Sequence, residues 1–415
     1  MTSRVLALLL LALLPYLTAL AQDIPADPPR FATAGTGLPS SVVTALAEDS
    51  TGFIWMGTAR GLVRFDGHRF RLYGNRWSTA PDETSLFVRS LLADRDGALW
   101  VGTDFVGLAR YEPGTDRLLP VDTSAVMPAS FSVNALAMDS QGQLWIGTDD
   151  QGLLVRSRDG ELKRVALSGQ EGLPEVRIEC LLIDRHGTLW VGSWGGLARL
   201  APGETRLAPI ALDGSNTSVT MLFEADDGHV WIGTREGRLW RTPADGLAPQ
   251  AVTPDSPETS AASVYAMLQA SPDQLWIGRA SGVEVRAASD GHLLYRLRHQ
   301  PGNPVSLASG EVHALLRDRG GQFWVGSYGG GVQRHNSLNT AFRLRDRLAF
   351  AEVDNAPDDL NVRAITVLAD GRILLGTQDR GIAVLDAQLR PLGALHDASG
   401  QPLLRGVRIT GLAET

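Results

Sequence analysis

The side chains that could do chemistry are spread thinly along this sequence and match no catalytic or metal-binding motif. Its 415 residues include eight histidines and one cysteine, and no two histidines stand at a metal-binding spacing. A single cysteine excludes an internal disulfide and a multi-cysteine zinc site, and we expect Cys180 to be an inert buried thiol. The sequence also lacks a Gly-x-Ser-x-Gly elbow and a phosphate-binding glycine loop. We therefore predict no metal, no cofactor and no catalytic residue.

A tryptophan recurs every 41 to 48 residues and organises the rest of the chain. Glycine always stands two positions after it, usually followed by Thr or Ser, and Val or Ile always stands twelve positions before it. An eighth copy has Leu374 in place of the tryptophan. The seven tryptophans are Trp55, Trp100, Trp145, Trp190, Trp231, Trp276 and Trp324.

Each repeat predicts four short strands. In the second repeat these are residues 88–93, 99–101, 108–111 and 117–119, with a turn at Asp94–Gly97. Four strands in about 45 residues are typical of a β-propeller blade. We predict an all-β protein, a seven-bladed β-propeller of four-stranded antiparallel blades, followed by the start of a second, incomplete propeller. The tryptophans are expected to fill the wedge between neighbouring blades.

The loops that follow the Gly-Thr or Gly-Ser pair differ from repeat to repeat, whereas the Asp-x-x-Gly turns keep one type. Because successive strands alternate in direction, these variable loops share one face of a propeller, and we predict that this face binds a polar ligand or a protein. The alternative is that they are solvated turn residues. The candidate ligand-binding residues are Arg60, Asp104, Phe105, Asp149, Asp150, Trp194, Arg235, Glu236, Arg279 and Tyr328.

A second candidate set comes directly after the Val or Ile column, near the start of the first strand of each repeat. Polar residues in an otherwise apolar strand are expected at the mouth of the central channel; contact between blades is the equal alternative. These residues are Arg89, Asn134, Glu179, Tyr265 and His313.

Residues 37–62 and 303–331 carry a further signal, because their repeat motifs resemble the two-component regulator propeller family of periplasmic sensor regions. The resemblance covers about residues 31–415. It implies two seven-bladed propellers, an immunoglobulin-like module, a transmembrane helix and a cytoplasmic kinase or diguanylate cyclase. No kinase, receiver or cyclase motif is present, so the output activity is not carried over to this chain.

The N-terminus predicts export. Arg4 precedes an apolar stretch at residues 5–14, Pro15 follows, and Ala19-Leu20-Ala21 is a cleavage signal, so a signal peptide is expected at residues 1–21. The net charge of −8 argues against nucleic acid as a partner. No later stretch is apolar enough to predict a membrane span in the mature chain.

We expect the propeller at residues 22–345, and the first blade and part of the second blade of another ring at residues 346–415. Phe31-Ala32-Thr33 is expected to complete the seventh blade, and residues 341–344 to open the second ring in the same way; one eight-bladed ring is the alternative.

The leading interpretation is a periplasmic ligand-sensing propeller, the sensory portion of a transmembrane signalling protein. Its expected partner is a small polar ligand, an oligosaccharide or an envelope protein. One alternative is an exported hydrolase or lyase acting on glycans, because residues 94–100 resemble the Asp-box turn of sialidase propellers. A sialidase also needs converging arginines and a tyrosine nucleophile, which could be supplied by Arg60, Arg235, Arg279 and Tyr328. The other alternative is an envelope scaffold.

Overall fold

The computed structural model describes residues 28–74, 86–94, 96–128, 130–167, 172–212, 217–243, 248–252, 262–336, 361–378, 381–387, 389, 391–397, 399–401, 403–404 and 407–413. Within these residues the chain forms eight four-stranded antiparallel sheets and no helix, as the repeats predict. None of the described residues forms a helix that could cross a membrane. The predicted signal peptide and the predicted strand at residues 341–344 lie outside the described residues.

Seven of the sheets lie in the first of two compact units, residues 1–337. The first sheet consists of β2 (Val43–Glu48), β3 (Ile54–Thr58), β4 (Gly61–Phe65) and β5 (Phe70–Tyr73). The second consists of β6 (Val88–Ala93), β7 (Leu99–Thr103), β8 (Gly107–Glu112) and β9 (Arg117–Pro120). The third consists of β10 (Val133–Met138), β11 (Leu144–Thr148), β12 (Leu153–Arg156) and β13 (Leu162–Ala166).

The fourth sheet consists of β14 (Ile178–Ile183), β15 (Leu189–Ser193), β16 (Gly196–Leu200) and β17 (Ala208–Ile210). The fifth consists of β18 (Val219–Glu224), β19 (Val230–Thr234), β20 (Leu239–Arg241) and β21 (Gln250–Ala251). The sixth consists of β22 (Val264–Ser271), β23 (Gln274–Arg279), β24 (Gly282–Ala287) and β25 (Leu293–Leu297).

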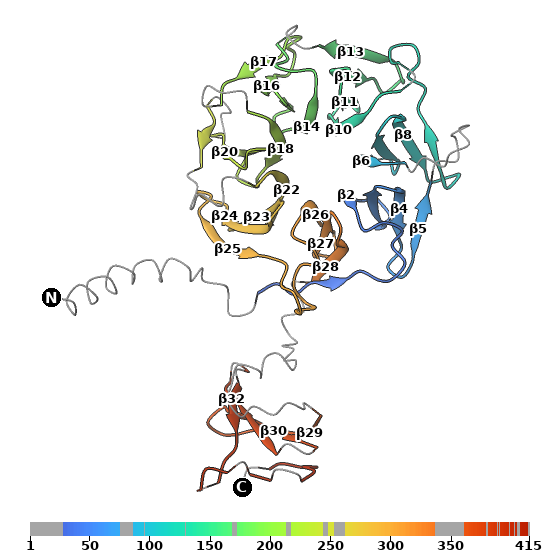
Figure 1. Cartoon of the computed structure of the whole chain (residues 1–415). Coiled ribbons are helices and arrows are strands. Elements are labelled where there is room, and N and C mark those ends of the chain that lie inside the picture. Colours follow the sequence, from blue (N-terminus) through green and yellow to red (C-terminus); the bar gives the residue numbers. More distant parts are fainter. Residues whose placement is uncertain are drawn as a thin grey trace, which may run out of the picture. The chain divides into compact units, whose positions relative to one another are not determined.

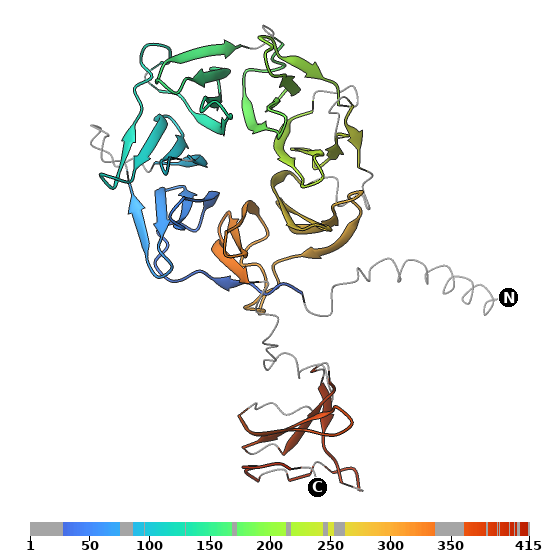
Figure 2. The same cartoon turned by 180° about the vertical axis from the view of Figure 1, so that it is seen from behind.

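The seventh sheet joins the two ends of the unit. It consists of β26 (Val312–Arg317), β27 (Gln322–Ser327), β28 (Gly331–Asn336) and, as its outermost strand, β1 (Ala32–Thr33). Ala32 pairs with Arg334, and the backbone N–H of Phe31 donates to the Val305 carbonyl at 2.9 Å. The first strand of each sheet contacts that of the next, and β26 contacts β2, so the seven sheets form a closed ring (Figures 1 and 2).

The recurring glycine and Val or Ile columns meet between neighbouring sheets. A Cβ atom on Gly102 would lie 2.8 Å from Cγ1 of Val133, the first residue of the next sheet. At the junction that closes the ring, a Cβ on Gly326 would lie 2.7 Å from Cγ1 of Val43. Only glycine allows the second strand to lie this close to the first strand of its neighbour, which explains why both columns are kept.

The recurring tryptophans pack between sheets, as expected. Six of them are at most 4% exposed, and Trp145 is partly buried. Trp55 shows the contact: its ring lies 4.4 Å from that of Tyr111 in the next sheet, measured between centroids.

The second unit, residues 338–415, contains one described sheet. Its strands are β29 (Val362–Val367), β30 (Ile373–Thr377), β31 (Ile382–Leu385) and β32 (Pro391–Ala394). The Ile409 N–H donates to the Thr377 carbonyl at 3.1 Å, and a Cβ on Gly376 would lie 2.4 Å from Cγ2 of Ile409. This repeats the contact of Gly102 with Val133, so Ile409 occupies the position of the next repeat's Val or Ile. Both expected domain limits, at residues 21 and 345, fall outside the described residues and remain predictions.

Candidate ligand-binding face

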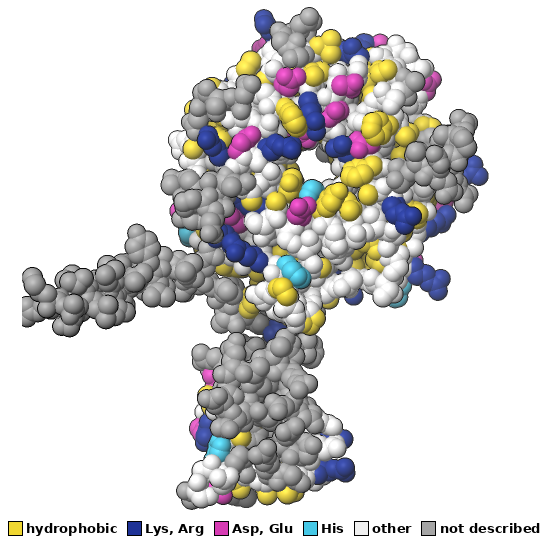
Figure 3. All heavy atoms as spheres, in the orientation of Figure 1, with side chains coloured by type: hydrophobic (Ala, Val, Ile, Leu, Met, Phe, Trp, Pro, Cys, Tyr) yellow, Lys and Arg dark blue, Asp and Glu magenta, His cyan; other side chains and the backbone are white. Residues whose placement is uncertain are grey.

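The two predicted sets of site residues lie at the same end of the sheets. Val88, at the start of β6, pairs with Thr103 at the end of β7, and the same pairing recurs between Val133 and Thr148. Each channel residue therefore stands beside the variable loop of its own sheet. On the face drawn in Figure 3, side chains of both charges, histidine and hydrophobic side chains border the central opening of the ring.

Arg177 is the centre of one polar cluster on this face. Its Nε lies 3.1 Å from Asp149 Oδ1 and 2.7 Å from Glu179 Oε1. Its guanidinium carbon is 4.1 Å from the ring centroid of Trp194, and that of Arg235 is 5.0 Å from the same ring. A partly exposed indole in contact with two arginines offers an apolar surface and hydrogen-bond donors side by side.

Asn134 connects this cluster to the first strand of the third sheet. Its Nδ2 donates to Asp149 Oδ1 at 3.3 Å and to the Ile178 carbonyl of the next sheet at 3.0 Å. The side-chain carbonyl oxygen of Asn134 is buried and has no hydrogen-bond partner among the described residues. Asn134 thus makes the contact between sheets and also positions a loop carboxylate.

Aromatic rings form the second cluster. The rings of Tyr265 and His313 stack at 4.1 Å with 17° between their planes, and Tyr328 lies 5.4 Å from His313. Burial lowers the pKa of His313, although the nearby Glu311 carboxylate opposes this shift. The imidazole is therefore neutral at pH 7, and the partly exposed Tyr328 extends the aromatic surface to solvent.

The loop of the second sheet carries an ion pair and an unusual backbone. Arg89 pairs with Asp104, and its guanidinium carbon lies 5.6 Å from the Phe87 ring centroid. Phe105 has a φ of +63°, is 71% exposed, and its N–H donates to Ser132 Oγ at 3.2 Å. A positive φ is uncommon for a residue with a bulky side chain, and here it presents the Phe105 ring to solvent.

The remaining loop candidates are Arg60, Asp150 and Glu236, and all three are exposed. The guanidinium of Arg60 is 3.5 Å from the Pro39 carbonyl, a weak contact. These side chains fit the solvated alternative as well as a binding role.

The prediction is wrong for Arg279, which is 1% exposed and does not reach the face. Its Nε lies 2.8 Å from Glu284 Oε2, and its Nη1 donates to the carbonyls of Gly237 and Ala262 at 2.9 and 2.7 Å. The Glu284 carboxylate on the neighbouring strand draws the guanidinium into the sheet.

Residues in the column that follows the Val or Ile make two kinds of contact. The equivalent residues Thr44 and Thr220 donate to Val88 and Val264 carbonyls of the next sheet at 2.5 and 2.7 Å, which is contact between blades. Arg89, Glu179 and His313 instead contact residues of the loop clusters described above.

Sequence reasoning missed Arg177 and Glu311, which stand directly before the Val or Ile column. The backbone carbonyl at this position accepts the N–H of the loop residue that follows Gly-Thr or Gly-Ser. The Trp194 N–H donates to the Arg177 carbonyl at 3.1 Å, and the Tyr328 N–H donates to the Glu311 carbonyl at 2.9 Å. The register therefore places this column beside the loop, and the aligned repeats could have identified it.

No described group of histidine, cysteine and acidic residues could hold a metal ion. Cys180 is 8% exposed, and burial raises the pKa of its thiol well above its usual range. The thiol is therefore protonated and poorly reactive, which agrees with an inert packing role.

Comparison with known proteins supports the propeller assignment. The sequence matches the two component regulator propeller family at residues 37–60, 82–105, 127–150, 172–195, 213–236 and 306–329. No curated protein matches the sequence.

Several solved structures share the fold. The extracellular domain of BT3049 from B. thetaiotaomicron, named for a hybrid two component system, is 21% identical with a TM-score of 0.70, over 90% of this chain and 51% of that one. BT4673 from the same organism, named for a one component system, has 20% identity and a TM-score of 0.63, over 91% and 49% of the two chains.

A virginiamycin B lyase from Staphylococcus aureus is 12% identical, with a TM-score of 0.56, over 71% of this chain and 94% of that one. By the shares given above, this chain spans about half the length of each of the two B. thetaiotaomicron domains. The glycine, Val or Ile and tryptophan columns that build the ring also lie in the matched segments. The chain forms propeller blades, and six of its segments match two component regulator propeller repeats.

Proposed function

We propose that this chain is an exported sensory propeller that binds a small polar ligand, an oligosaccharide or an envelope protein. The ligand contacts the variable-loop face of the ring. The observation that carries this proposal is the Arg177 cluster, where Asp149, Glu179 and Trp194 from three different segments surround one guanidinium. An arginine, two carboxylates and an indole that converge from separate segments give this face a defined polar and aromatic surface.

The aromatic cluster supports the same face. Tyr265 and His313 come from the first strands of two sheets, and Tyr328 comes from the variable loop of the second of them. Flat rings beside charged and amide groups suit ligands that have both apolar faces and hydroxyl groups, as sugars have.

In this proposal the ring at residues 22–345 is the sensory portion of a transmembrane signalling protein, and residues 346–415 begin a second propeller. The second unit supports the latter point. Ile365 is 65% exposed on β29, whereas Leu136 in the same column of the ring is 9% exposed because a preceding sheet covers it. A surface of this kind is typical of a blade whose neighbour is another blade.

Binding assays can test the proposed face. The purified chain is titrated with a panel of neutral and acidic oligosaccharides, and both heat of binding and product formation are measured. We expect saturable binding without turnover, weakened at least about tenfold in Trp194→Ala. Leu119→Ala is the control, because Leu119 has the same 38% exposure but lies on the outermost strand of its sheet.

Each other result has a clear meaning. Equal binding by both variants would reject the face. Turnover of a glycan would favour the hydrolase or lyase alternative, and capture of a defined envelope protein in the absence of any glycan binding would favour the scaffold.

A further inference from the structure

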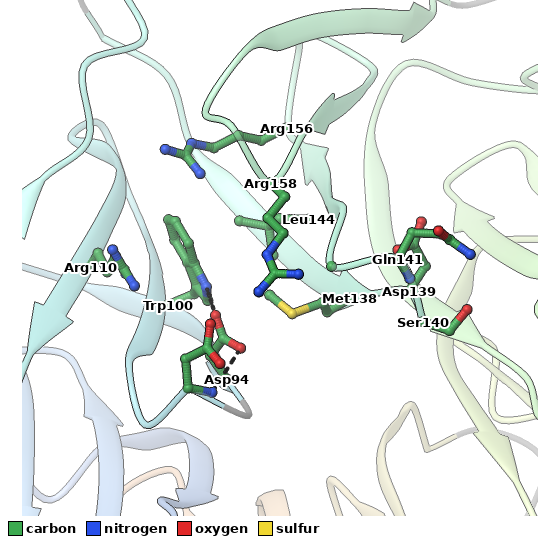
Figure 4. A pocket seen from close by; sticks show the side chains of 12 residues that line it. Asp94, Trp100, Arg110, Met138, Asp139, Ser140, Gln141, Leu144, Arg156 and Arg158 are labelled. Atoms are coloured by element: carbon green, nitrogen blue, oxygen red, sulfur yellow. Dashed lines mark hydrogen bonds between the residues drawn. The ribbon is translucent and has the colours of Figure 1, made fainter.

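A pocket of about 270 Å³ lies between the second and third sheets, and it is lined by three arginines. It is placed at the Asp-x-x-Gly turns, opposite to the variable loops. Arg110 comes from β8, Arg156 ends β12, and Arg158 lies in the turn that follows. In Figure 4, Arg156 and Arg158 extend from the third sheet toward Trp100 of the second. Met138 and Leu144 form an apolar part of the wall.

Packing does not account for Arg156. In several sheets its column covers the tryptophan of the preceding sheet with an aromatic side chain: Tyr111 lies 4.4 Å from Trp55, and Phe65 lies 5.7 Å from Trp324. In the sixth sheet the same column holds Arg286. Leu200, also in this column, packs in the cluster that includes Trp145. Arg156 instead places a partly exposed guanidinium 5.1 Å from the Trp100 ring centroid, so a charged group covers this ring in place of the apolar one.

Arg110 brings a second positive charge to the same ring. Its guanidinium carbon is also 5.1 Å from the Trp100 centroid, and its Nε is buried without a hydrogen-bond partner among the described residues. Burial, together with repulsion from Arg110, lowers the pKa of Arg156. Two guanidiniums on one indole repel each other, and an anion that contacts both would relieve this repulsion.

No carboxylate of the described residues neutralises these arginines, although arginines elsewhere in the ring are neutralised. Arg286 occupies the column of Arg156 and has Glu284 Oε2 at 2.9 Å from its Nε. Arg64 occupies the column of Arg110, and its Nη1 lies 3.3 Å from Asp116 Oδ1. Neither Arg110 nor Arg156 has such a partner within 4 Å in the described part of the chain.

Two of the three acidic residues of the pocket, Asp94 and Asp139, are engaged in their own turns, and the third, Asp96, is exposed to solvent. Asp139 Oδ2 accepts the indole N–H of Trp145 at 3.2 Å, while its Oδ1 accepts the backbone N–H of Gln143 at 2.8 Å. Asp94 Oδ2 accepts the Trp100 indole N–H at 3.2 Å. The Asp94 and Asp139 carboxylates stabilise the turns, and no described carboxylate lies within 4 Å of the Arg110, Arg156 or Arg158 guanidinium nitrogens.

We propose that this pocket is a second ligand site, distinct from the variable-loop face, which binds the oxyanion of a small molecule through Arg110, Arg156 and Arg158. The group is a carboxylate, a sulfate or a phosphate, because a planar fork of donors matches oxygens spaced as in these anions. The bound anion separates the two guanidiniums that share Trp100 and removes their mutual repulsion.

Calorimetric titration of the whole chain tests the site. Sulfate, phosphate, citrate and glucuronate are added at constant ionic strength set with chloride, and glucose is the uncharged counterpart of glucuronate. We expect one saturable site for at least one oxyanion and none for glucose. A preference for glucuronate would identify a sugar-borne carboxylate, and a preference for phosphate or sulfate would identify a compact anion.

Two variants locate the site. Arg156→Leu copies Leu200 of the next sheet and should fold normally, and Arg158→Gln changes an exposed side chain. Each should weaken oxyanion binding at least about tenfold. Arg317→Leu is the matched control, since Arg317 is exposed and lies 5.6 Å from the Phe323 ring, outside the pocket. The proposal is overturned if no oxyanion binds saturably, or if Arg156→Leu and Arg158→Gln bind as tightly as Arg317→Leu.

Discussion

The indole N–H of Trp190 donates to Asp184 Oδ2 at 2.9 Å and so ties the core of a sheet to the turn that precedes it. The same bond, six residues apart, occurs in four other sheets of the ring at 2.7 to 3.2 Å. In the two remaining sheets alanine replaces the aspartate: Ala225 precedes Trp231 and Ala270 precedes Trp276. The indole nitrogens of Trp231 and Trp276 are buried and have no hydrogen-bond partner among the described residues.

The first prediction restores the missing bond. Ala225→Asp should raise the free energy of unfolding by about 1 kcal/mol, because the new carboxylate can accept the Trp231 N–H. The turn is already formed, with Gly228 N–H donating to the Ala225 carbonyl at 2.9 Å, as Gly187 does to Asp184 at the same distance. Thermal and denaturant unfolding measure the change. Asp184→Ala should destabilise by about 1–3 kcal/mol, and a gain in stability from that variant would contradict the explanation.

The repeat columns predict most of the fold because each column is a contact that occurs in every sheet. The glycine that allows Val133 to approach is visible in the sequence without any structure. The site is less predictable, because a side chain in a variable loop depends on partners outside the loop. Arg279 was expected at the surface, but Glu284 on the next strand holds it in the interior. Arg177 was missed because it precedes the first strand, and only the strand register brings it beside Trp194.

The second prediction concerns the strand that joins the two ends of the ring. Phe31 is 2% exposed and packs against Trp276, with ring centroids 6.2 Å apart. Phe31→Ala should cost about 3–5 kcal/mol, because it removes a buried aromatic ring and loosens the pairing of β1 with β28. Phe105→Ala removes the same atoms from a side chain that is 71% exposed and should change stability little. Similar melting temperatures for the two variants would exclude this role for Phe31.

The third prediction is a dependence of stability on pH. Burial lowers the pKa of His335, whose Nδ1 lies 3.0 Å from the Arg30 carbonyl, below the ordinary value of 6.5. The unfolded chain therefore binds more protons than the folded chain below pH 6.5, so the free energy of unfolding should fall as pH decreases from 7 to 5. His335→Phe, which copies Phe65 in the same column, should flatten this slope. His313 shifts in the same direction, so part of the slope should remain. His68→Gln, at an exposed position, is the matched histidine control.

The last prediction concerns Glu284, which holds two buried arginines. Its Oε2 lies 2.8 Å from Arg279 Nε and 2.9 Å from Arg286 Nε, and all three side chains are at most 3% exposed. Glu284→Gln keeps the shape but removes the carboxylate that Arg279 and Arg286 share in the interior, which should cost about 3–5 kcal/mol.

Glu161→Gln is the matched control, because the pair of Glu161 with Lys163 is 64% exposed on both sides and such pairs contribute about 0–1 kcal/mol. Urea unfolding of both variants gives the comparison. A small and equal effect would mean that water reaches Arg279 and Arg286. In that case Arg279 would return to the set of residues that a ligand can contact.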